Sequence, residues 1–82
     1  MRLTDARTGD RLILQGLPAN PAAEGQVRSL GLLPGGAIRL LRRAPFHGPL
    51  LLEVDGRIIA LGWKIASGLE VSPVPAPGSA AN

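Results

Sequence analysis

The sequence predicts a small, mostly β domain: a strongly bent barrel of about five short strands, with one short α-helix and a disordered C-terminal tail. Three features favour this fold class. Short aliphatic runs alternate with turn signals, a single segment has helical spacing, and 11 Gly and 8 Pro supply tight turns. Short strands with frequent turns are typical of small barrels, and closure protects the sheet edges. The 82 residues have room for one domain, which we expect to be SH3-like.

Five segments are expected to form strands: residues 11–15, 37–44, 50–54, 57–61 and 68–71. Between the third and fourth lies Asp55-Gly56, the strongest hairpin signal in the chain. A two-residue turn there places Leu52 opposite Ile59 on the core-facing side. The same register pairs Leu50 with Leu61 on that side, so this hairpin supplies much of the core.

The single helix should begin after Asn20, a good N-cap, with Pro21 at the first helical position. Its apolar stripe falls at helical spacing, on Ala23, Val27 and Leu30. Gly31 should end it in a left-handed conformation, which places Leu32 over Val27. Proline followed by glycine then predicts a type II turn, at Pro34-Gly35.

The last segment of the chain differs in composition. Residues 72–82 contain three prolines, no charge and one large aliphatic side chain. Such a segment buries too little surface to offset the entropy of ordering it. We therefore expect a folded domain over residues 1–71 and a disordered Pro/Ala-rich tail over residues 72–82.

The composition excludes several classes of protein. The chain has no cysteine, so disulfides, thiolate metal sites and cysteine nucleophiles are excluded. No apolar run approaches the ~20 residues of a membrane span, and Asp5, Arg7 and Asp10 occupy the place of a signal peptide. We expect a soluble protein without a targeting segment.

Neither a metal site nor a catalytic site is expected. His47 is the only histidine, with only Glu53 and Asp55 near it in sequence, whereas a metal site needs three or four convergent ligands. His47 is thus a weak candidate for a metal ligand, and the sequence favours a solvated loop residue. The serines lack an evident His/Asp partner. We expect a protein that is not an enzyme and holds no cofactor.

A family resemblance rests on residues 27–38 (VRSLGLLPGGAI), supported by His47-Gly48-Pro49, Ile59-Ala60-Leu61 and Ala66. With the motif Leu30-Gly31-Leu32 followed by Pro34-Gly35, the chain resembles the FeoA family. The resemblance implies an SH3-like cytoplasmic accessory protein of bacterial ferrous iron uptake, with a weak implication of transition-metal binding. It implies a partner, the FeoB membrane transporter with its cytosolic G-protein-like domain, and membrane contact only through that partner. The chain departs from the family pattern at Gly25 and at Gly62-Trp63-Lys64.

A partner-binding surface can be predicted from strand alternation. Leu41 should lie with Arg39 and Arg43 on the face opposite the core, and Leu51 and Ile58 should share that face. Apolar side chains and arginines are typical of interfaces. We therefore predict docking through Leu41, Leu51, Ile58, Arg39 and Arg43. The alternative is that this face is simply solvated. For Trp63, three roles stay open: a core residue, a lid on the barrel, or a surface anchor.

Two other functions stay open. One is an SH3-like module of an iron-dependent transcriptional repressor, disfavoured because no winged-helix segment accompanies the barrel in these 82 residues. The other is a small nucleic-acid-binding barrel. A net charge of +3 and only two aromatic residues, Phe46 and Trp63, disfavour it, since such proteins use basic stripes and stacking platforms.

Overall fold

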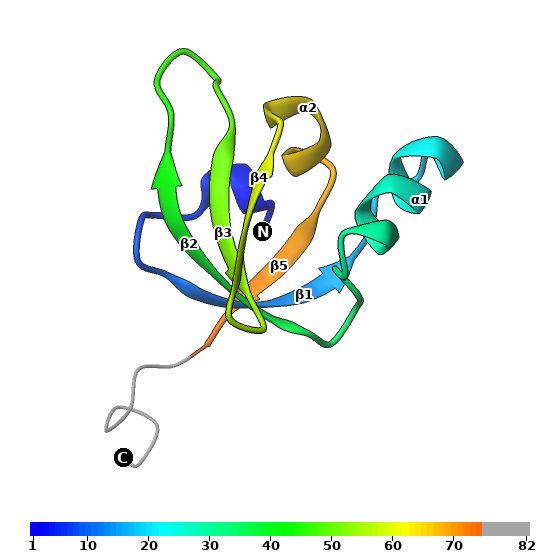
Figure 1. The fold of residues 1–82 in the computed structure, drawn as a ribbon, viewed down its shortest axis with the longest axis horizontal. Coiled ribbons are helices and arrows are strands. Elements are labelled where there is room, and N and C mark those ends of the chain that lie inside the picture. The colour runs from blue at the N-terminus through cyan, green and yellow to red at the C-terminus, as the bar shows by residue number, and fades with distance from the viewer. Residues whose placement is uncertain (75–82) are drawn as a thin grey trace.

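The computed structural model describes residues 1–74 as one curled, five-stranded antiparallel sheet with strand order β4-β3-β2-β1-β5 (Figure 1). The predicted mostly β, SH3-like architecture with one main helix is confirmed. No helix within residues 1–74 is long and apolar enough to cross a membrane. The elements are η1 (Leu3–Asp5), β1 (Arg11–Gly16), α1 (Pro21–Ser29), β2 (Ala37–Arg43), β3 (Leu50–Val54), β4 (Arg57–Leu61), α2 (Trp63–Ala66) and β5 (Glu70–Pro73).

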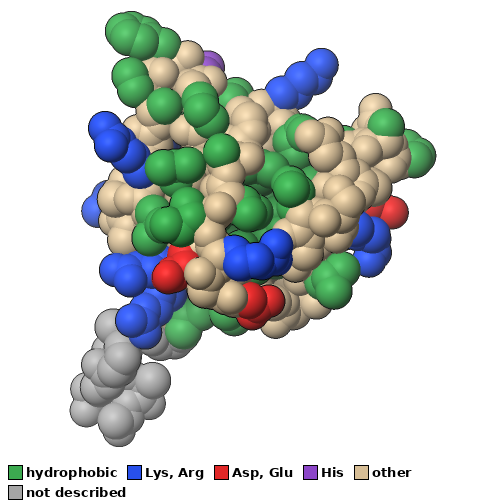
Figure 2. Space-filling view, in the orientation of Figure 1, with side chains coloured by type: hydrophobic (Ala, Val, Ile, Leu, Met, Phe, Trp, Pro, Cys, Tyr) green, Lys and Arg blue, Asp and Glu red, His purple; other side chains and the backbone are tan. Residues whose placement is uncertain are grey.

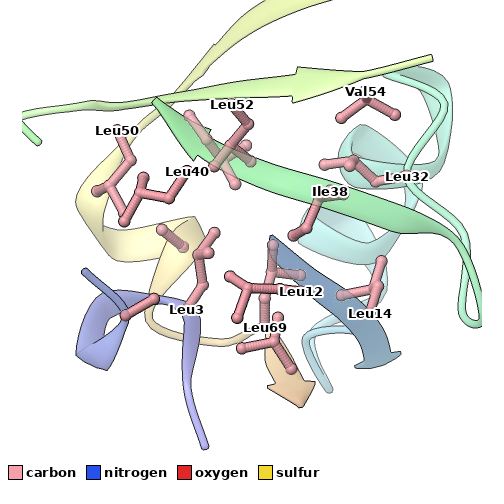
Figure 3. Close-up of a cluster of buried hydrophobic side chains, with 14 of the residues drawn as sticks. Leu3, Leu12, Leu14, Leu32, Ile38, Leu40, Leu50, Leu52, Val54 and Leu69 are labelled. Atoms are coloured by element: carbon pink, nitrogen blue, oxygen red, sulfur yellow. The ribbon is translucent and has the colours of Figure 1, made fainter. Parts of the chain in front are cut away.

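The core fills the concave side of the sheet and is built almost entirely from aliphatic side chains (Figure 3). The β3–β4 hairpin has the predicted register, with Leu52 opposite Ile59 and Leu50 opposite Leu61. Positive φ angles at Asp55 (51°) and Gly56 (77°) match the turn type that two-residue hairpins favour. Leu50, Leu52 and Leu61 are buried and Ile59 is half-buried. One face of β3 and β4 is therefore committed to the core.

Both ends of α1 follow the sequence prediction. The Asn20 side-chain oxygen accepts hydrogen bonds from the backbone N–H groups of Ala22 (2.9 Å) and Ala23 (3.3 Å). Gly31 has a φ of 88°, and its N–H donates to the Arg28 carbonyl at 3.0 Å. The Leu32 N–H donates to the Val27 carbonyl at 3.3 Å, which completes the Schellman arrangement.

The turn after α1 is also as predicted. Gly35 has a φ of 89°, and the Gly36 N–H donates to the Leu33 carbonyl at 3.0 Å. This geometry belongs to a type II turn with proline in its second position. It leads the chain directly from the helix into β2.

A β-bulge in β2 overturns one sequence prediction. Leu40 pairs with Leu52, but the next partners are Arg42 with Leu51 and Arg43 with Leu50. Since an extra residue reverses the alternation of side chains, Arg43 lies on the core side of the sheet. The prediction that Arg43 shares the outer face with Arg39 and Leu41 is therefore wrong.

The last strand extends further than the composition indicated. In β5, Ser72 pairs with Ile13 and Pro73 with Leu12, although the composition of residues 72–82 predicts a tail. Proline is compatible with an edge strand because its missing N–H need not enter the ladder. The remainder of the predicted tail, residues 75–82, lies outside the described residues.

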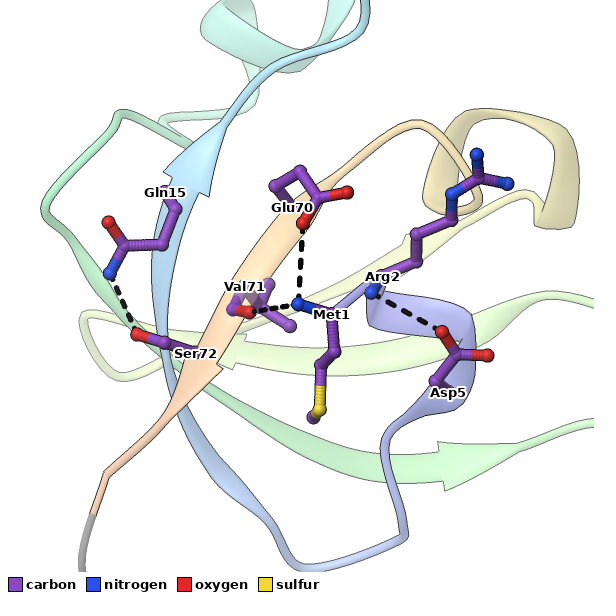
Figure 4. Close-up of polar contacts among 7 residues, drawn as sticks. All are labelled: Met1, Arg2, Asp5, Gln15, Glu70, Val71 and Ser72. Atoms are coloured by element: carbon purple, nitrogen blue, oxygen red, sulfur yellow. Dashed lines mark hydrogen bonds and ion pairs between the residues drawn. The ribbon is translucent and has the colours of Figure 1, made fainter.

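The outer edge of β5 is covered by the start of the chain (Figure 4). The Val71 N–H donates to the Met1 carbonyl at 2.7 Å. The amino group of Met1 in turn donates to the Val71 carbonyl at 3.1 Å and lies 3.3 Å from the Glu70 carboxylate. On the other side of the strand, the Gln15 amide donates to the Ser72 hydroxyl at 2.7 Å. Exposed sheet edges are prone to pairing with other chains, and the hydrogen bonds between Met1 and Val71 cover this edge of β5.

Candidate docking surface

The outer face of β2, β3 and β4 brings most of the predicted binding residues together. Arg39 pairs with Glu53, and Glu53 pairs with Ile58, so these three side chains form a row across the strands. The adjacent row centres on Leu51, which lies between Arg42 of β2 and Ala60 of β4. Figure 2 shows hydrophobic and basic side chains next to one another over this part of the sheet.

We call the docking surface the outward side chains Leu41, Leu51 and Ile58 with their flanking arginines, Arg39 and Arg42. Ile58 is 66% exposed, Leu41 and Leu51 are half-buried, and both arginines are exposed. Apolar contacts at the centre with arginine around them are characteristic of protein interfaces. Because the core already uses the other face of these strands, the outer apolar side chains are free to meet a partner.

The bulge decides which arginine belongs to this surface. Leu41 and Arg42 together oppose Leu51, so the bulge keeps Leu41 beside Leu51 and adds Arg42 to the outer face. Arg43 instead donates a hydrogen bond from Nη1 to the Ala6 carbonyl at 2.7 Å. The prediction assumed strict alternation along residues 37–44, but the doublets Leu40-Leu41 and Arg42-Arg43 interrupt it and were the available sign of a bulge.

The docking surface continues toward β1 as a groove of about 440 Å³. Its lining includes Arg11 and Ile13 of β1, Arg39 of β2, Glu53 of β3, Asp55 and Val74. Arg11 pairs with Arg39 across the strands. The groove therefore adds a third exposed guanidinium, that of Arg11, to those of Arg39 and Arg42.

The Leu-Gly-Leu motif has a structural role. Leu32 is buried, Leu30 is half-buried against the core, and a Cβ at Gly31 would collide with the Arg57 guanidinium. Arg57 donates from Nη2 to the Leu30 carbonyl at 3.1 Å. The motif thus joins the end of α1 to the start of β4, and Arg57 is a contributor that the sequence did not indicate.

His47 lies against an aromatic ring. Its imidazole stacks on the Trp63 indole with ring centroids 4.1 Å apart and planes 5° from parallel. Trp63 is half-buried and packs against the core, which agrees with its interpretation as a barrel lid. Within the described residues, no group of three or more His, Cys, Asp or Glu side chains could hold a metal ion. The absence of a resident metal stays a prediction.

Sequence reasoning missed Phe46. It lies between Pro45 and His47 in the β2–β3 loop and is 99% exposed. A sequence signal was available, since a large apolar residue within a Pro/Gly-rich loop rarely reaches the core.

Comparison with known protein families and solved structures shows which family has this fold. The FeoA domain profile matches residues 1–73. The chain belongs to the FeoA family. Among solved structures, the FeoA protein of Chlorobium tepidum superposes with a TM-score of 0.82 at 28% identity, over 92% of this chain and 71% of that one. An iron uptake regulatory protein (FeoA) superposes with a TM-score of 0.79 at 28% identity, over 90% and 96%.

The family's fold also occurs inside a larger protein. The manganese-activated repressor ScaR matches with a TM-score of 0.83 and 30% identity, over 90% of this chain but only 35% of the repressor. A comparison with curated proteins gives no significant match in sequence. Family membership and SH3-like fold are thus established together.

Proposed function

We propose that this protein is a cytoplasmic accessory protein of ferrous iron uptake that regulates a FeoB-type membrane transporter by docking on its cytosolic region. Membership of the FeoA family supports the link to iron uptake, because one similar structure is an iron uptake regulatory protein. In this role the ferrous ion is the transporter's cargo. The protein acts through its surface, without catalysis and without a resident cofactor.

The observation that carries the proposal is the docking surface. Leu41, Leu51 and Ile58 lie on one outer face, next to Arg39 and Arg42. Isolated exposed apolar side chains are ordinary on proteins. Here they adjoin one another on a rigid sheet and are bordered by arginine, the charged side chain most enriched at interfaces.

The proposal is tested by measuring the affinity of the full chain for the purified cytosolic domain of its transporter. Ile58→Glu places a charge at the most exposed apolar position of the docking surface. We expect it to weaken binding more than about tenfold, as loss of an interface anchor does. Leu33→Glu is the matched control, because Leu33 is 50% exposed on the turn between α1 and β2.

Binding should survive Leu33→Glu unchanged, and both variants should melt like the parent. Equal affinities of the two variants and the parent would show that the docking surface is elsewhere. No binding by the parent at any concentration tested would remove the transporter as partner.

The similarity to the repressor ScaR supports a second candidate, a module that serves a metal-dependent transcriptional repressor. Such a role predicts binding to the repressor's DNA-binding domain or to its operator. A gel-shift and pull-down experiment with those two components distinguishes the functions. Protein–DNA affinity that falls steeply with salt would favour this candidate or a nucleic-acid-binding barrel over transporter docking.

A further inference from the structure

The end of the β2–β3 hairpin is an apolar tip that projects from the domain. Figure 1 shows this loop, residues 44–49, extending beyond the neighbouring strands. Phe46 at its apex is 99% exposed and therefore contacts almost nothing within the described residues. In Figure 2 hydrophobic side chains cover this end of the hairpin. Removing a phenylalanine side chain from water is favourable, and the side chain of Phe46 is fully available for burial against a partner.

The loop conformation holds Phe46 outward. Phe46 and His47 have φ angles of 57° and 56°, a region that is unfavourable for residues with a side chain. The Ala44 N–H donates to the Pro49 carbonyl and the Gly48 N–H to the Pro45 carbonyl, both at 3.1 Å. A Cβ at position 48 would lie 2.7 Å from the Ala44 Cβ, so the turn needs glycine there.

His47 fixes the tip to the body of the domain. Its stacking on Trp63 connects the loop to a side chain that packs on the core. With His47 stacked on Trp63, the adjacent Phe46 projects outward from a loop that is anchored to the domain. Loss of conformational entropy on binding is smaller for such a preorganised element.

The backbone of the tip has few N–H groups without a hydrogen-bond partner. Pro45 and Pro49 have no N–H, and the Gly48 N–H is already bonded within the loop. Only Phe46 and His47 retain N–H groups without a backbone acceptor in this turn. Unsatisfied backbone N–H and C=O groups both carry a penalty in an apolar medium, and the two prolines and the Gly48 hydrogen bond reduce the number of free N–H groups in this loop.

The charges around the tip are basic. Arg42 and Arg43 precede the loop and are exposed, and Arg43 Cζ lies 5.9 Å from the centre of the Trp63 ring that supports His47. Lys64, also exposed, follows Trp63 on α2. The next acidic residue along β3 is Glu53. Figure 2 shows basic side chains on both sides of the tip and acidic side chains only at a distance on that face.

We propose that this tip inserts into the surface of an anionic membrane, with Phe46 at the headgroup–acyl boundary and Arg42, Arg43 and Lys64 on lipid phosphates. The inference does not rest on the proposed function, and it replaces the expectation that membrane contact comes only through a partner. Basic residues near an anionic leaflet each add attraction, and a single apolar anchor makes binding weak and reversible.

A protein pocket is the other class of partner that an exposed phenylalanine could fit. A stable protein interface buries about 800 Å² on each side, which requires a broad surface around the anchor. The tip is narrow, and its surroundings are charged with one sign. Those properties fit a fluid anionic surface better than a shaped protein cavity.

The experiment uses Trp63, the only tryptophan, as the donor for energy transfer to dansyl-labelled lipid in vesicles. Vesicles rich in phosphatidylglycerol should give a saturable signal with the full chain at about 0.1 M salt, and the signal should fall at about 0.5 M salt. Phosphatidylcholine vesicles should bind far more weakly. Phe46→Ala should lower the partition coefficient about five- to tenfold, and Phe46→Leu should restore most of it.

Leu33→Ala is the matched control, because it removes an exposed apolar side chain from the turn before β2, at the opposite end of that strand from the tip; it should bind vesicles like the parent. Absence of vesicle binding by the parent overturns the proposal. Binding that Phe46→Ala leaves unchanged overturns it too, since charge alone then accounts for it. If Phe46→Ala impairs transporter binding and vesicles are not bound, the tip is a protein anchor.

Discussion

The guanidinium of Arg57 donates a hydrogen bond to the carbonyl oxygen of Leu30 at 3.1 Å. That carbonyl belongs to the last turn of α1, where helix carbonyls lack partners within the helix. The bond joins an edge strand to the helix that follows β1, and it passes directly over Gly31. Gly31 is therefore needed for its positive φ, and its lack of a side chain also leaves space for the Arg57 guanidinium.

Gly31→Val is expected to lower stability by at least about 1–2 kcal/mol, because a β-branched residue is strained at a φ of 88°. It must also displace Arg57 and so remove the bond to Leu30. For a domain of this size the melting temperature should fall by about 4–8 °C per kcal/mol. Thermal unfolding followed by circular dichroism measures this.

Gly25→Ala is the matched control. Gly25 is exposed inside α1, and a Cβ there meets nothing within 4 Å. Alanine should raise stability by about 1 kcal/mol through helix propensity. If Gly31→Val melts like the parent, the assignment of the helix end is wrong.

The two arginines of the bulge should behave differently. Arg43→Gln removes the 2.7 Å hydrogen bond to the Ala6 carbonyl and should destabilise the domain by about 1 kcal/mol while preserving transporter binding. Arg42→Gln should leave the melting temperature unchanged and weaken transporter binding. Denaturant titration and affinity measurements on both variants check this, and reversed roles would mean that the register of β2 is misassigned.

Isolated protein is expected to lack a tight ferrous site. The chain has no cysteine, and its one histidine stacks on Trp63. Anaerobic calorimetry with ferrous iron should show no saturable submicromolar binding, and His47→Ala should leave the titration unchanged. A stoichiometric site that disappears in His47→Ala would falsify this prediction.

What the sequence predicted correctly depends on neighbouring residues. Asn20, Gly31 and Pro34-Gly35 each fix a local backbone geometry, and Asp55-Gly56 sets a register that then follows for the whole hairpin. These features needed no knowledge of distant parts of the chain.

What the sequence missed depends on contacts between distant segments. The bulge at Leu41, the bond from Arg57 to Leu30 and the stacking of His47 on Trp63 are determined by packing across the sheet. The strand at Ser72 and Pro73 was missed for the same reason. Their composition predicts a tail, and they form a strand because the edge of β1 offers them a partner. The outward placement of Leu41, Leu51, Ile58 and Arg39 was accordingly predicted, except for the one arginine that the bulge exchanges, and docking at this surface stays a prediction.

The sharpest test of this surface compares two adjacent leucines of β3. Leu51 is half-buried on the outer face, between Arg42 and Ala60, whereas Leu52 is fully buried in the core. Leu52→Asp places a carboxylate among aliphatic side chains, at a cost of several kcal/mol that is comparable to the whole stability of a small domain. It should unfold the protein.

Leu51→Asp should keep a native melting curve but lose co-purification with the transporter and transporter-dependent iron uptake. If Leu51→Asp unfolds as completely as Leu52→Asp, the outer face is part of the core. If it folds and supports normal uptake, the transporter docks elsewhere.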